Sequence, residues 1–255
     1  MGVFDGQTAL VTGAGTGLGK ASALALAAEG ALVIVTELPD RMERARATVE
    51  KIVAAGGAGR ALPLDVLDLA GVAACVDQAA AVTGRIDVLV NNAGVNVRQM
   101  AFDVTEAGWD ATVDVNLKGV FFVAQAVGRK MRDQSPAGGA IVNMSSQMGL
   151  VGYYERASYC SSKAGVVNLS RVLAIEWAPH DIRVNSVCPT FVETPLTKPM
   201  FEGNPEFSRD VHARILNHRL ATPEDVAAAV VFLASPGAAM VNGHALPVDG
   251  GWTAI

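Results

Sequence analysis

The chain has 255 residues, of which 51% are hydrophobic and 18% charged, and its formal net charge is −5. An acidic balance without a basic stripe argues against nucleic acid or an anionic membrane as a partner. The three cysteines are too widely spaced for a disulfide framework or a zinc site. The start, "MGVFDGQTALV", lacks the basic and apolar regions of a secretion signal, and no apolar run reaches the roughly 18 residues of a membrane span. We therefore expect a cytoplasmic protein without a bound metal.

Short apolar runs alternate with longer stretches of helical period along the whole chain. We expect strands at residues 8–12, 31–36, 61–64, 86–90, 140–144, 182–187 and 244–248. We expect helices at residues 18–29, 40–54, 69–82, 106–132, 157–177 and 223–234. The strand runs are continuously apolar, which is typical of parallel strands covered on both faces. The prediction is an α/β fold: a single-domain, Rossmann-type, doubly wound parallel sheet of about seven strands flanked by helices on both faces.

The first expected strand, in "TALVTGAGTGLGKA", runs into Gly13, Gly15, Gly17 and Gly19 before the first helix. Glycines let a pyrophosphate approach the backbone, and the helix N-terminus offers unpaired N–H groups to it. The pattern G-x-G-x-x-G does not fit, because Leu18 stands at the place of its last glycine. The spacing is T-G-x-x-x-G-x-G. We expect a phosphate-binding loop, with a plain glycine-rich turn as the alternative.

Glu37 stands at the end of the second expected strand, 24 residues after Gly13. An acid at this place accepts hydrogen bonds from the adenosine ribose hydroxyls and repels a 2′-phosphate. No basic residue stands at Thr16 or next to Glu37 to attract that phosphate, and Arg41 is the nearest in sequence. The sequence therefore predicts NAD in preference to NADP, with a solvated surface glutamate as the alternative.

The stretch "ASYCSSKAGV" places Tyr159 and Lys163 four residues apart, on one face of the expected helix. An ammonium about 4 Å from a phenol contributes about 4 kcal/mol at an effective dielectric constant near 20. At 1.36 kcal/mol for each pKa unit, this lowers the phenol's pKa by about 3, before any opposing effect of burial. We expect Lys163 to bring the pKa of Tyr159 near neutrality, where a general base works best.

Further motifs follow one another in order along the chain: "TGAGTGLG", "LDV" (64–66), "NNAG" (91–94), "DVNLKG", "VNMSS" (142–146), "YCSSK" and "VDGG" (248–251). Together they resemble the short-chain dehydrogenase/reductase family over essentially the whole length. The resemblance implies hydride transfer between a nicotinamide cofactor and an alcohol or ketone, an activity of the EC 1.1.1 class. It also implies that residues 1–255 form one dinucleotide-binding and catalytic domain.

The resemblance assigns the catalytic positions. Tyr159 is the general base or acid, and Lys163 also binds the nicotinamide ribose. Ser146, thirteen residues before Tyr159, stabilises the substrate oxygen, and Asn116 holds a water in a proton relay. The alternative for Ser146 and Asn116 is strand-end capping and a helix-breaking polar residue. Cys160 is expected to pack rather than to act as a nucleophile.

The expected cofactor contacts are Gly13, Gly15, Thr16, Gly17, Leu18, Gly19, Glu37, Asp65, Val66, Asn92, Ala93, Gly94, Tyr159, Lys163, Pro189, Thr190, Val192 and Thr194. By the same resemblance, Asp65 contacts adenine and "NNAG" lies beneath the cofactor. Thr190 departs from the glycine that commonly follows this proline, so the local backbone path differs from the family pattern. Thr194 remains placed to meet the nicotinamide amide.

One long segment, "CPTFVETPLTKPMFEGNPEF" (188–207), contains four prolines and breaks the alternation. Irregular segments of this length in a compact domain are usually functional or disordered. We expect residues 190–217 to form a loop or helix segment that covers the substrate. The expected substrate lining mixes polar and apolar side chains, as suits a small hydroxylated compound: Asn96, Arg98, Gln147, Met148, Tyr153 and Phe191, together with Glu155, Arg156 and Met200.

The predicted function is NAD-dependent hydride transfer on a secondary alcohol of a sugar, polyol or sugar acid. "VNGHALPVDGGW" and "TGLGKA" resemble the family's sugar-acid members, such as gluconate 5-dehydrogenase. A second hypothesis is a reductase of 3-oxoacyl thioesters or small hydrophobic ketones, which Glu37 disfavours because biosynthetic reduction usually draws on NADPH. A third is a non-catalytic dinucleotide-binding scaffold, which an intact Ser146–Tyr159–Lys163 set disfavours. The resemblance also implies a homotetramer assembled through the helices at 106–132 and 157–177.

Overall fold

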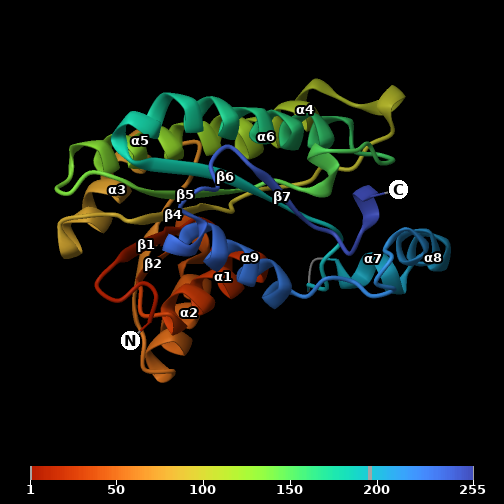
Figure 1. Ribbon diagram of the computed structural model, residues 1–255. Helices are drawn as coiled ribbons and strands as arrows, with labels where there is room; N and C mark the ends of the chain where they lie inside the picture. Colours follow the sequence, from red (N-terminus) through yellow and green to blue (C-terminus); the bar gives the residue numbers. More distant parts are fainter. Residues whose placement is uncertain (1, 195–196, 255) are drawn as a thin grey trace.

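The computed structural model describes residues 2–194 and 197–254. Within them, seven parallel strands form one sheet in the order β3-β2-β1-β4-β5-β6-β7 (Figure 1). The strands are β1 (Thr8–Val11), β2 (Leu32–Glu37), β3 (Ala58–Pro63), β4 (Val88–Asn91), β5 (Gly139–Met144), β6 (Ile182–Pro189) and β7 (Ala245–Val248). The strand order reverses between β1 and β4, which places a ligand-binding crevice at their carboxyl ends. The predicted Rossmann-type sheet is confirmed, with strand bounds shifted by at most three residues.

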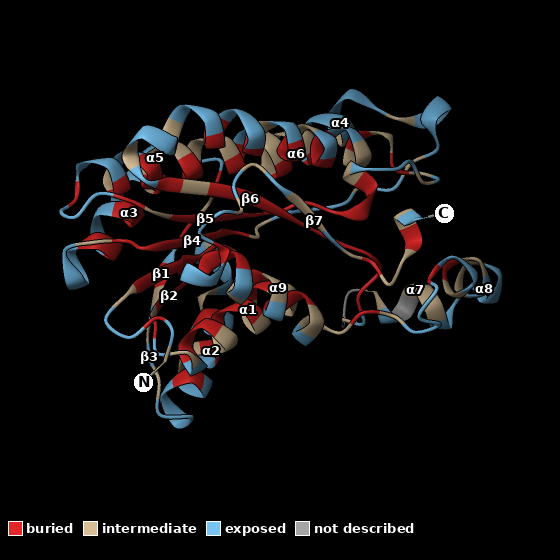
Figure 2. Ribbon diagram, in the orientation of Figure 1, coloured by how far each residue is buried: buried red, intermediate tan, exposed pale blue. Residues whose placement is uncertain are grey.

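Helices cover both faces of the sheet. One face carries α1 (Gly17–Ala28), α2 (Met42–Ala54) and α9 (Pro223–Ala234). The other carries α3 (Leu69–Thr83), α5 (Val120–Asp133) and α6 (Ala157–Trp177), with α4 (Glu106–Val113) beside α6. Figure 2 shows the buried residues along the sheet and on the helix faces turned toward it. The central strands β1 and β4 are buried throughout, which is why they read as continuous apolar runs.

The helix expected at residues 106–132 is interrupted. Between α4 and α5 the backbone widens into a π-helical segment at Asp114–Gly119, which buries Asn116 completely. Segments of this kind are rare and occur frequently at functional sites. The interruption therefore falls on the asparagine that the sequence singled out.

The irregular segment contains two helices, α7 (Lys198–Glu202) and α8 (Pro205–Arg214), which we call the lid. The side chain of Asn204 caps α8 by accepting a hydrogen bond from the backbone N–H of Phe207 (3.0 Å), and Pro205 occupies the first turn. A parallel bridge between Val192 and Ala221 joins the two ends of the segment. Figure 1 shows the lid beyond one end of the sheet, near the C-terminus. Residues 195 and 196, part of the expected 190–217 segment, lie outside the described residues.

None of the helices in the described part of the chain combines the length and apolar character that crossing a membrane requires.

Candidate active site

The glycine loop after β1 is tied to the end of β4. The Oγ1 of Thr12 accepts hydrogen bonds from the backbone N–H groups of Asn92 and Ala93, both at 2.9 Å. The amide Nδ2 of Asn92 donates to the carbonyl oxygens of Thr12 (2.9 Å) and Gly13 (3.1 Å). A Cβ added at Gly19 would contact this amide and lie 2.5 Å from the carbonyl oxygen of Gly13. The loop and the strand end are therefore held together as one surface, in which position 19 has no room for a side chain.

This surface suits the pyrophosphate of a dinucleotide. Thr16, at the N-cap of α1, makes no side-chain hydrogen bond to the helix, and the first turn carries no acidic residue. The N–H groups of Gly17, Leu18 and Gly19 thus remain available to an anion at the positive end of the helix dipole. Gly17 has a φ of 54° with open space where a side chain would stand.

Glu37 ends β2 directly beside this loop. Its Oε1 accepts a hydrogen bond from the backbone N–H of Leu38 (3.0 Å), and its Oε2 lies 2.6 Å from the position of a Cβ added at Gly15. The Cβ of Arg44, on α2, lies 2.7 Å from the same position. Arg44 was missed by the sequence argument, because a residue seven positions beyond Glu37 returns to the loop only when α2 packs on the sheet.

Asp65 and Val66 follow β3. Asp65 is half-buried, and its Oδ1 accepts a hydrogen bond from the backbone N–H of Leu67 (2.9 Å), so the carboxylate holds the turn. Val66 is buried against Gly119, where an added Cβ would lie 2.8 Å from its Cγ2. Both residues therefore line the same crevice edge as the glycine loop, on the β3 side.

Three predicted site residues meet beyond the end of β4. A Cβ added at Gly94 would lie 3.1 Å from Oδ1 of Asn116 and 3.6 Å from Nζ of Lys163. The Asn116 amide fixes the loop after β4, because its Nδ2 donates to the carbonyl oxygen of Val95 (2.8 Å) and its Oδ1 accepts from the Val95 N–H (2.8 Å). The Nδ2 also reaches the hydroxyl of Ser162 (3.3 Å) on α6.

Ser146 and Ser145 follow β5 but differ in orientation. The Ser145 hydroxyl donates to the carbonyl oxygen of Lys163 (2.8 Å) and so supports α6. The Ser146 hydroxyl accepts a hydrogen bond from the Met148 N–H (3.1 Å) and lies close enough to Tyr159 to lower the pKa of its phenol. Ser146 rather than Ser145 thus lies beside the Tyr159 phenol, and it also makes the capping contact given above as the alternative.

Lys163 is buried, and its Nζ donates to the carbonyl oxygen of Met144 (2.8 Å). Burial lowers the pKa of Lys163 to about 8, with a smaller opposing effect from Cys188. The Nζ lies 5.7 Å from the centre of the Tyr159 ring.

The pKa of Tyr159 moves opposite to expectation. Burial raises it, and this effect outweighs the hydrogen bond with Ser146 and the charge of Arg156, both of which lower it. The sequence argument placed an ammonium about 4 Å from a partly screened phenol. In the structure Tyr159 packs against apolar rings, and the effect of burial on its pKa dominates.

Those rings form the aromatic cluster, defined here as Tyr153, Phe191, Phe201, Phe207 and Trp252. Its neighbouring rings have centroids between 5.2 Å (Phe201–Phe207) and 6.3 Å (Tyr153–Phe207) apart, and Tyr159 packs against the cluster. The Tyr153 hydroxyl donates to Oδ2 of Asp210 on α8 (2.7 Å). This bond therefore fastens α8 to the aromatic cluster against which Tyr159 packs.

The remaining substrate candidates separate into two groups. Gln147, Met148 and Arg156 are buried, and the latter two contact the aromatic cluster. Asn96 and Arg98 lie on the exposed loop after β4, where Arg98 forms an ion pair with Glu155. The structure thus buries the first group in the substrate half of the fold and leaves the second exposed.

Comparisons with known proteins agree with this arrangement. A family model described as enoyl-(acyl carrier protein) reductase matches residues 13–253. A D-threitol dehydrogenase of Mycolicibacterium smegmatis is 44% identical, over 98% of this chain and 94% of that protein. A 2-dehydro-3-deoxy-D-gluconate 5-dehydrogenase of Dickeya dadantii is 38% identical, over 98% and 97%. The solved structure of a gluconate 5-dehydrogenase from Burkholderia cenocepacia, in complex with NADP and tartrate, is 34% identical with a TM-score of 0.92, over 98% and 96%.

The chain belongs to the short-chain dehydrogenase/reductase family. It is therefore an NAD(P)-dependent oxidoreductase. In this short-chain dehydrogenase, the backbone N–H of Thr190 at the end of β6 donates to the carbonyl oxygen of Val248 (3.1 Å) on β7. Further along, the Thr194 N–H donates to Oγ1 of Thr197 (3.0 Å), and Val192 makes the bridge described above.

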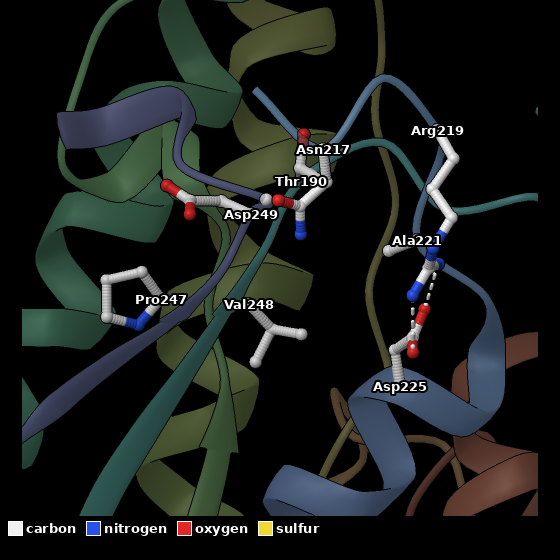
Figure 3. A pocket seen from close by; sticks show the side chains of 9 residues that line it. Thr190, Asn217, Arg219, Ala221, Asp225, Pro247, Val248 and Asp249 are labelled. Atoms are coloured by element: carbon white, nitrogen blue, oxygen red, sulfur yellow. Dashed lines mark hydrogen bonds and ion pairs between the residues drawn. The ribbon is translucent and has the colours of Figure 1, made fainter. Parts of the chain in front are cut away.

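A cavity of about 300 Å³ lies where β6 and β7 end (Figure 3). Thr190 and Asn217 lie close together in it, and Arg219 pairs with Asp225 at its other end. Its lining is Thr190, Asn217, Arg219, Ala221, Asp225, Pro247, Val248, Asp249 and Gly250. Because Ser146, Tyr159 and Lys163 are not among these residues, the cavity is not where the proposed chemistry takes place.

Proposed function

We propose that this enzyme oxidises a secondary alcohol on a sugar, polyol or sugar acid, or reduces the corresponding ketone, with NAD. The observation that carries the proposal is the meeting of Asn116, Lys163 and the Gly94 backbone beside Ser146 and Tyr159, at the carboxyl edge where the glycine loop lies. Similarity to dehydrogenases named for threitol and for a deoxygluconate supports the substrate class.

In this proposal each side chain has a separate task. When bound, the nicotinamide supplies the hydride acceptor. The Ser146 hydroxyl donates a hydrogen bond to the substrate oxygen, and Tyr159 exchanges a proton with that oxygen as the hydride moves: its phenol gives the proton in ketone reduction, and its phenolate takes the proton in alcohol oxidation. Lys163, with a pKa of about 8, is poised to pass a proton on near neutral pH, and Asn116 holds the exit route next to it.

Replacing Tyr159 tests this assignment. Tyr159→Phe keeps the ring that packs against the aromatic cluster and removes only the proton acceptor. We expect kcat to fall by about 1,000-fold while the Kd for NADH, measured by fluorescence, stays within about threefold. Tyr154→Phe, at a largely exposed neighbouring ring, is the control. Turnover that survives in Tyr159→Phe places the chemistry elsewhere.

The preference for NAD rests on Glu37. Its carboxylate lies against Gly15, where it is placed to accept hydrogen bonds from the adenosine ribose. The nearby Arg44 is half-exposed and interacts with Glu43 at 3.7 Å, so its charge is partly balanced. The comparison of kcat/KM for NAD and NADP tests the preference, and Glu37→Gln is expected to reduce it. Equal kcat/KM values for NAD and NADP would overturn the proposal. Both cofactors must be assayed, because a relative of similar structure was solved with NADP.

A second candidate function is reduction of a 3-oxoacyl thioester with NADPH. The description of the matching family model and the apolar rings of the aromatic cluster favour it. Assays with a 3-oxoacyl thioester and NADPH, run beside the polyol and sugar-acid panel with NAD, decide between the two. Faster turnover of the thioester would replace the sugar-like substrate class.

We further propose that residues 1–255 work as one catalytic domain whose lid covers the substrate, and that the chain assembles as a cytoplasmic homotetramer. Apolar side chains on the outer faces of two helices support the assembly: Trp109 on α4, and Val172 and Ile175 on α6, the last 76% exposed. Light scattering after size-exclusion chromatography measures the mass. Ile175→Glu is expected to reduce the assembly, and a monomeric wild type would refute it.

A further inference from the structure

Arg156 is a buried cation whose charge is not balanced. Its side chain is 2% exposed, and among the described residues no carboxylate pairs with it. Nη1 donates to the carbonyl oxygen of Tyr154 (2.8 Å), whereas Nη2 is fully covered and has no hydrogen-bond partner. Arginine stays protonated when buried, so an unpartnered guanidinium of this kind is unfavourable and calls for an explanation.

The neighbours of Arg156 do not supply the missing acceptor. Its guanidinium lies over the rings of Tyr153 and Phe191, with its Cζ 5.2 and 5.6 Å from their centroids. The rings exclude water and attract the cation, but they do not replace an oxygen acceptor. The adjacent acid, Glu155, is held in the left-handed backbone region with a φ of 61° and pairs with Arg98 instead.

The position of Arg156 in the fold directs its charge toward the reacting centre. It is the N-cap residue of α6, and Tyr159 is the third residue of that helix. The first turn of α6 contains no acidic residue, so the helix dipole and the guanidinium reinforce each other there. A negatively charged ligand beside Tyr159 would be stabilised by both.

Gln147 is a second buried residue whose polar atoms lack partners. It follows Ser146 directly, is 1% exposed, and neither its Nε2 nor its Oε1 has a partner among the described residues. An amide with a free donor and a free acceptor matches a hydroxyl group, which can accept and donate. The two residues proposed to hold the substrate oxygen are thus flanked by a free amide and a free guanidinium.

We propose that Arg156 binds a carboxylate of the substrate and Gln147 one of its hydroxyls, so that among sugar-like compounds this enzyme takes sugar acids. This deepens the proposed function and rests on it. The contact would be a charge-assisted hydrogen bond, the stronger kind for a guanidinium. Because Nη2 is covered, the side chains around it, among them Tyr153 and Phe191, must move for the ligand to enter, and their return would exclude water from the ion pair.

Matched pairs of substrates test the proposal: D-gluconate against D-glucitol, and D-threonate against D-threitol. We expect wild type to have the higher kcat/KM on the acid of each pair. Arg156→Met should lower the acid-to-alditol ratio of kcat/KM about 10- to 100-fold, and Arg156→Lys should restore part of it. The control is Arg214→Met, since this guanidinium also lies over Tyr153 (6.0 Å) but is paired with Asp210. It should leave the ratio within about twofold.

Calorimetric binding of the four compounds to the NADH complex of Tyr159→Phe separates this inference from the proposed function. If the acids bind in a way that depends on Arg156 but wild type turns over no sugar-like compound, the inference stands and the proposed function is refuted. Turnover of alditols that is indifferent to Arg156, with no preference for acids, would do the reverse.

Two further measurements exclude other roles for Arg156. Because Arg156→Met removes an unpaired buried charge, its Tm should equal or exceed that of wild type, and a fall of more than about 5 °C would make Arg156 structural. Because the charge of Arg156 also lowers the pKa of Tyr159, the midpoint of the pH dependence of kcat/KM should rise in Arg156→Met, equally for acids and alditols. A displaced midpoint with an unchanged acid-to-alditol ratio would mean that Arg156 acts on Tyr159 rather than on a carboxylate.

Discussion

The two halves of this sheet treat their polar groups differently. In the nucleotide half, built on β1 to β4, Thr12 and Asn92 have their side-chain hydrogen bonds made within the chain. In the substrate half, by contrast, some buried polar side-chain atoms have no hydrogen-bond partner. Among the described residues, all such atoms belong to Gln147, Arg156 and Thr190. A cofactor shared by a family can bind to a surface whose side-chain hydrogen bonds are already made. A particular substrate, in contrast, can supply the hydrogen-bond partners that its site lacks.

The largest effect is expected from a substitution in the glycine loop that binds the cofactor. In Gly19→Ala, the new methyl group would collide with the carbonyl oxygen of Gly13 and the amide of Asn92. We expect NADH binding to weaken by on the order of 100-fold, measured by fluorescence titration, because the loop must move away from the phosphate. Gly17→Ala, in the same loop, meets open space and should cost only about 1 kcal/mol of backbone strain. Equal effects of the two changes would show that steric fit at Gly19 is unimportant.

A second effect comes from the pKa of Lys163, which folding lowers from 10.5 to about 8. The unfolded chain then binds more protons than the folded one between these values, so stability rises as pH rises through that window. Relative to Lys163→Met, wild type should gain about 2 kcal/mol in free energy of unfolding between pH 8 and pH 10. Urea denaturation at a series of pH values measures the difference. A constant difference would mean that Lys163 keeps an ordinary pKa.

The fastening of the lid should contribute less. Tyr153→Phe removes the hydrogen bond to Asp210 and keeps the ring in the aromatic cluster. We expect a loss of about 1 kcal/mol in stability and faster amide hydrogen exchange in α8, with no change in NADH binding. Tyr154→Phe, which packs edge-on against the same ring, is the matched control. Unchanged exchange in α8 would show that the rings alone hold the lid.

The smallest effect is expected at the cap of α9. Asp225 accepts hydrogen bonds from Arg219 and from the Thr222 N–H, which together lower its pKa to about 2. This contribution is present above about pH 4 and is lost as pH falls toward 2. Asp225→Asn should therefore cost about 0.5–1 kcal/mol at neutral pH, since the pair is partly exposed, and nothing near pH 2. A pH-independent cost would assign the effect to packing.

Much of the nucleotide half could be predicted from the sequence, because its signals are local. The strand, the glycines and the helix start lie within twelve consecutive residues, and Glu37 follows at the next strand end. Arg44 escaped, since its approach to Gly15 depends on how α2 packs.

The substrate half was less accessible to such reasoning. Ser146, Tyr159 and Lys163 were identified from their spacing, but the direction of the Tyr159 pKa depends on rings that arrive more than thirty residues later in the chain. The helix α8 did carry a readable signal, because "NPE" at 204–206 combines an N-cap, a first-turn proline and an early acid. The π-helical turn at Asn116 has no comparable mark in the sequence.

The bridge between Val192 and Ala221 allows the segment that carries the lid to change in evolution independently of the sheet. The backbone N–H of Glu193 donates to Ala221 (2.9 Å), so the chain leaves and rejoins the scaffold at a single clamped point. Once the ends of an excursion are fixed, doubling its length adds only about 0.6 kcal/mol of closure entropy. Insertions, deletions or exchanges of the part beyond Thr194 can thus alter which molecule is admitted while Ser146, Tyr159 and Lys163 keep their places on β5 and α6, and grafting this stretch from a relative offers a direct route to new selectivity.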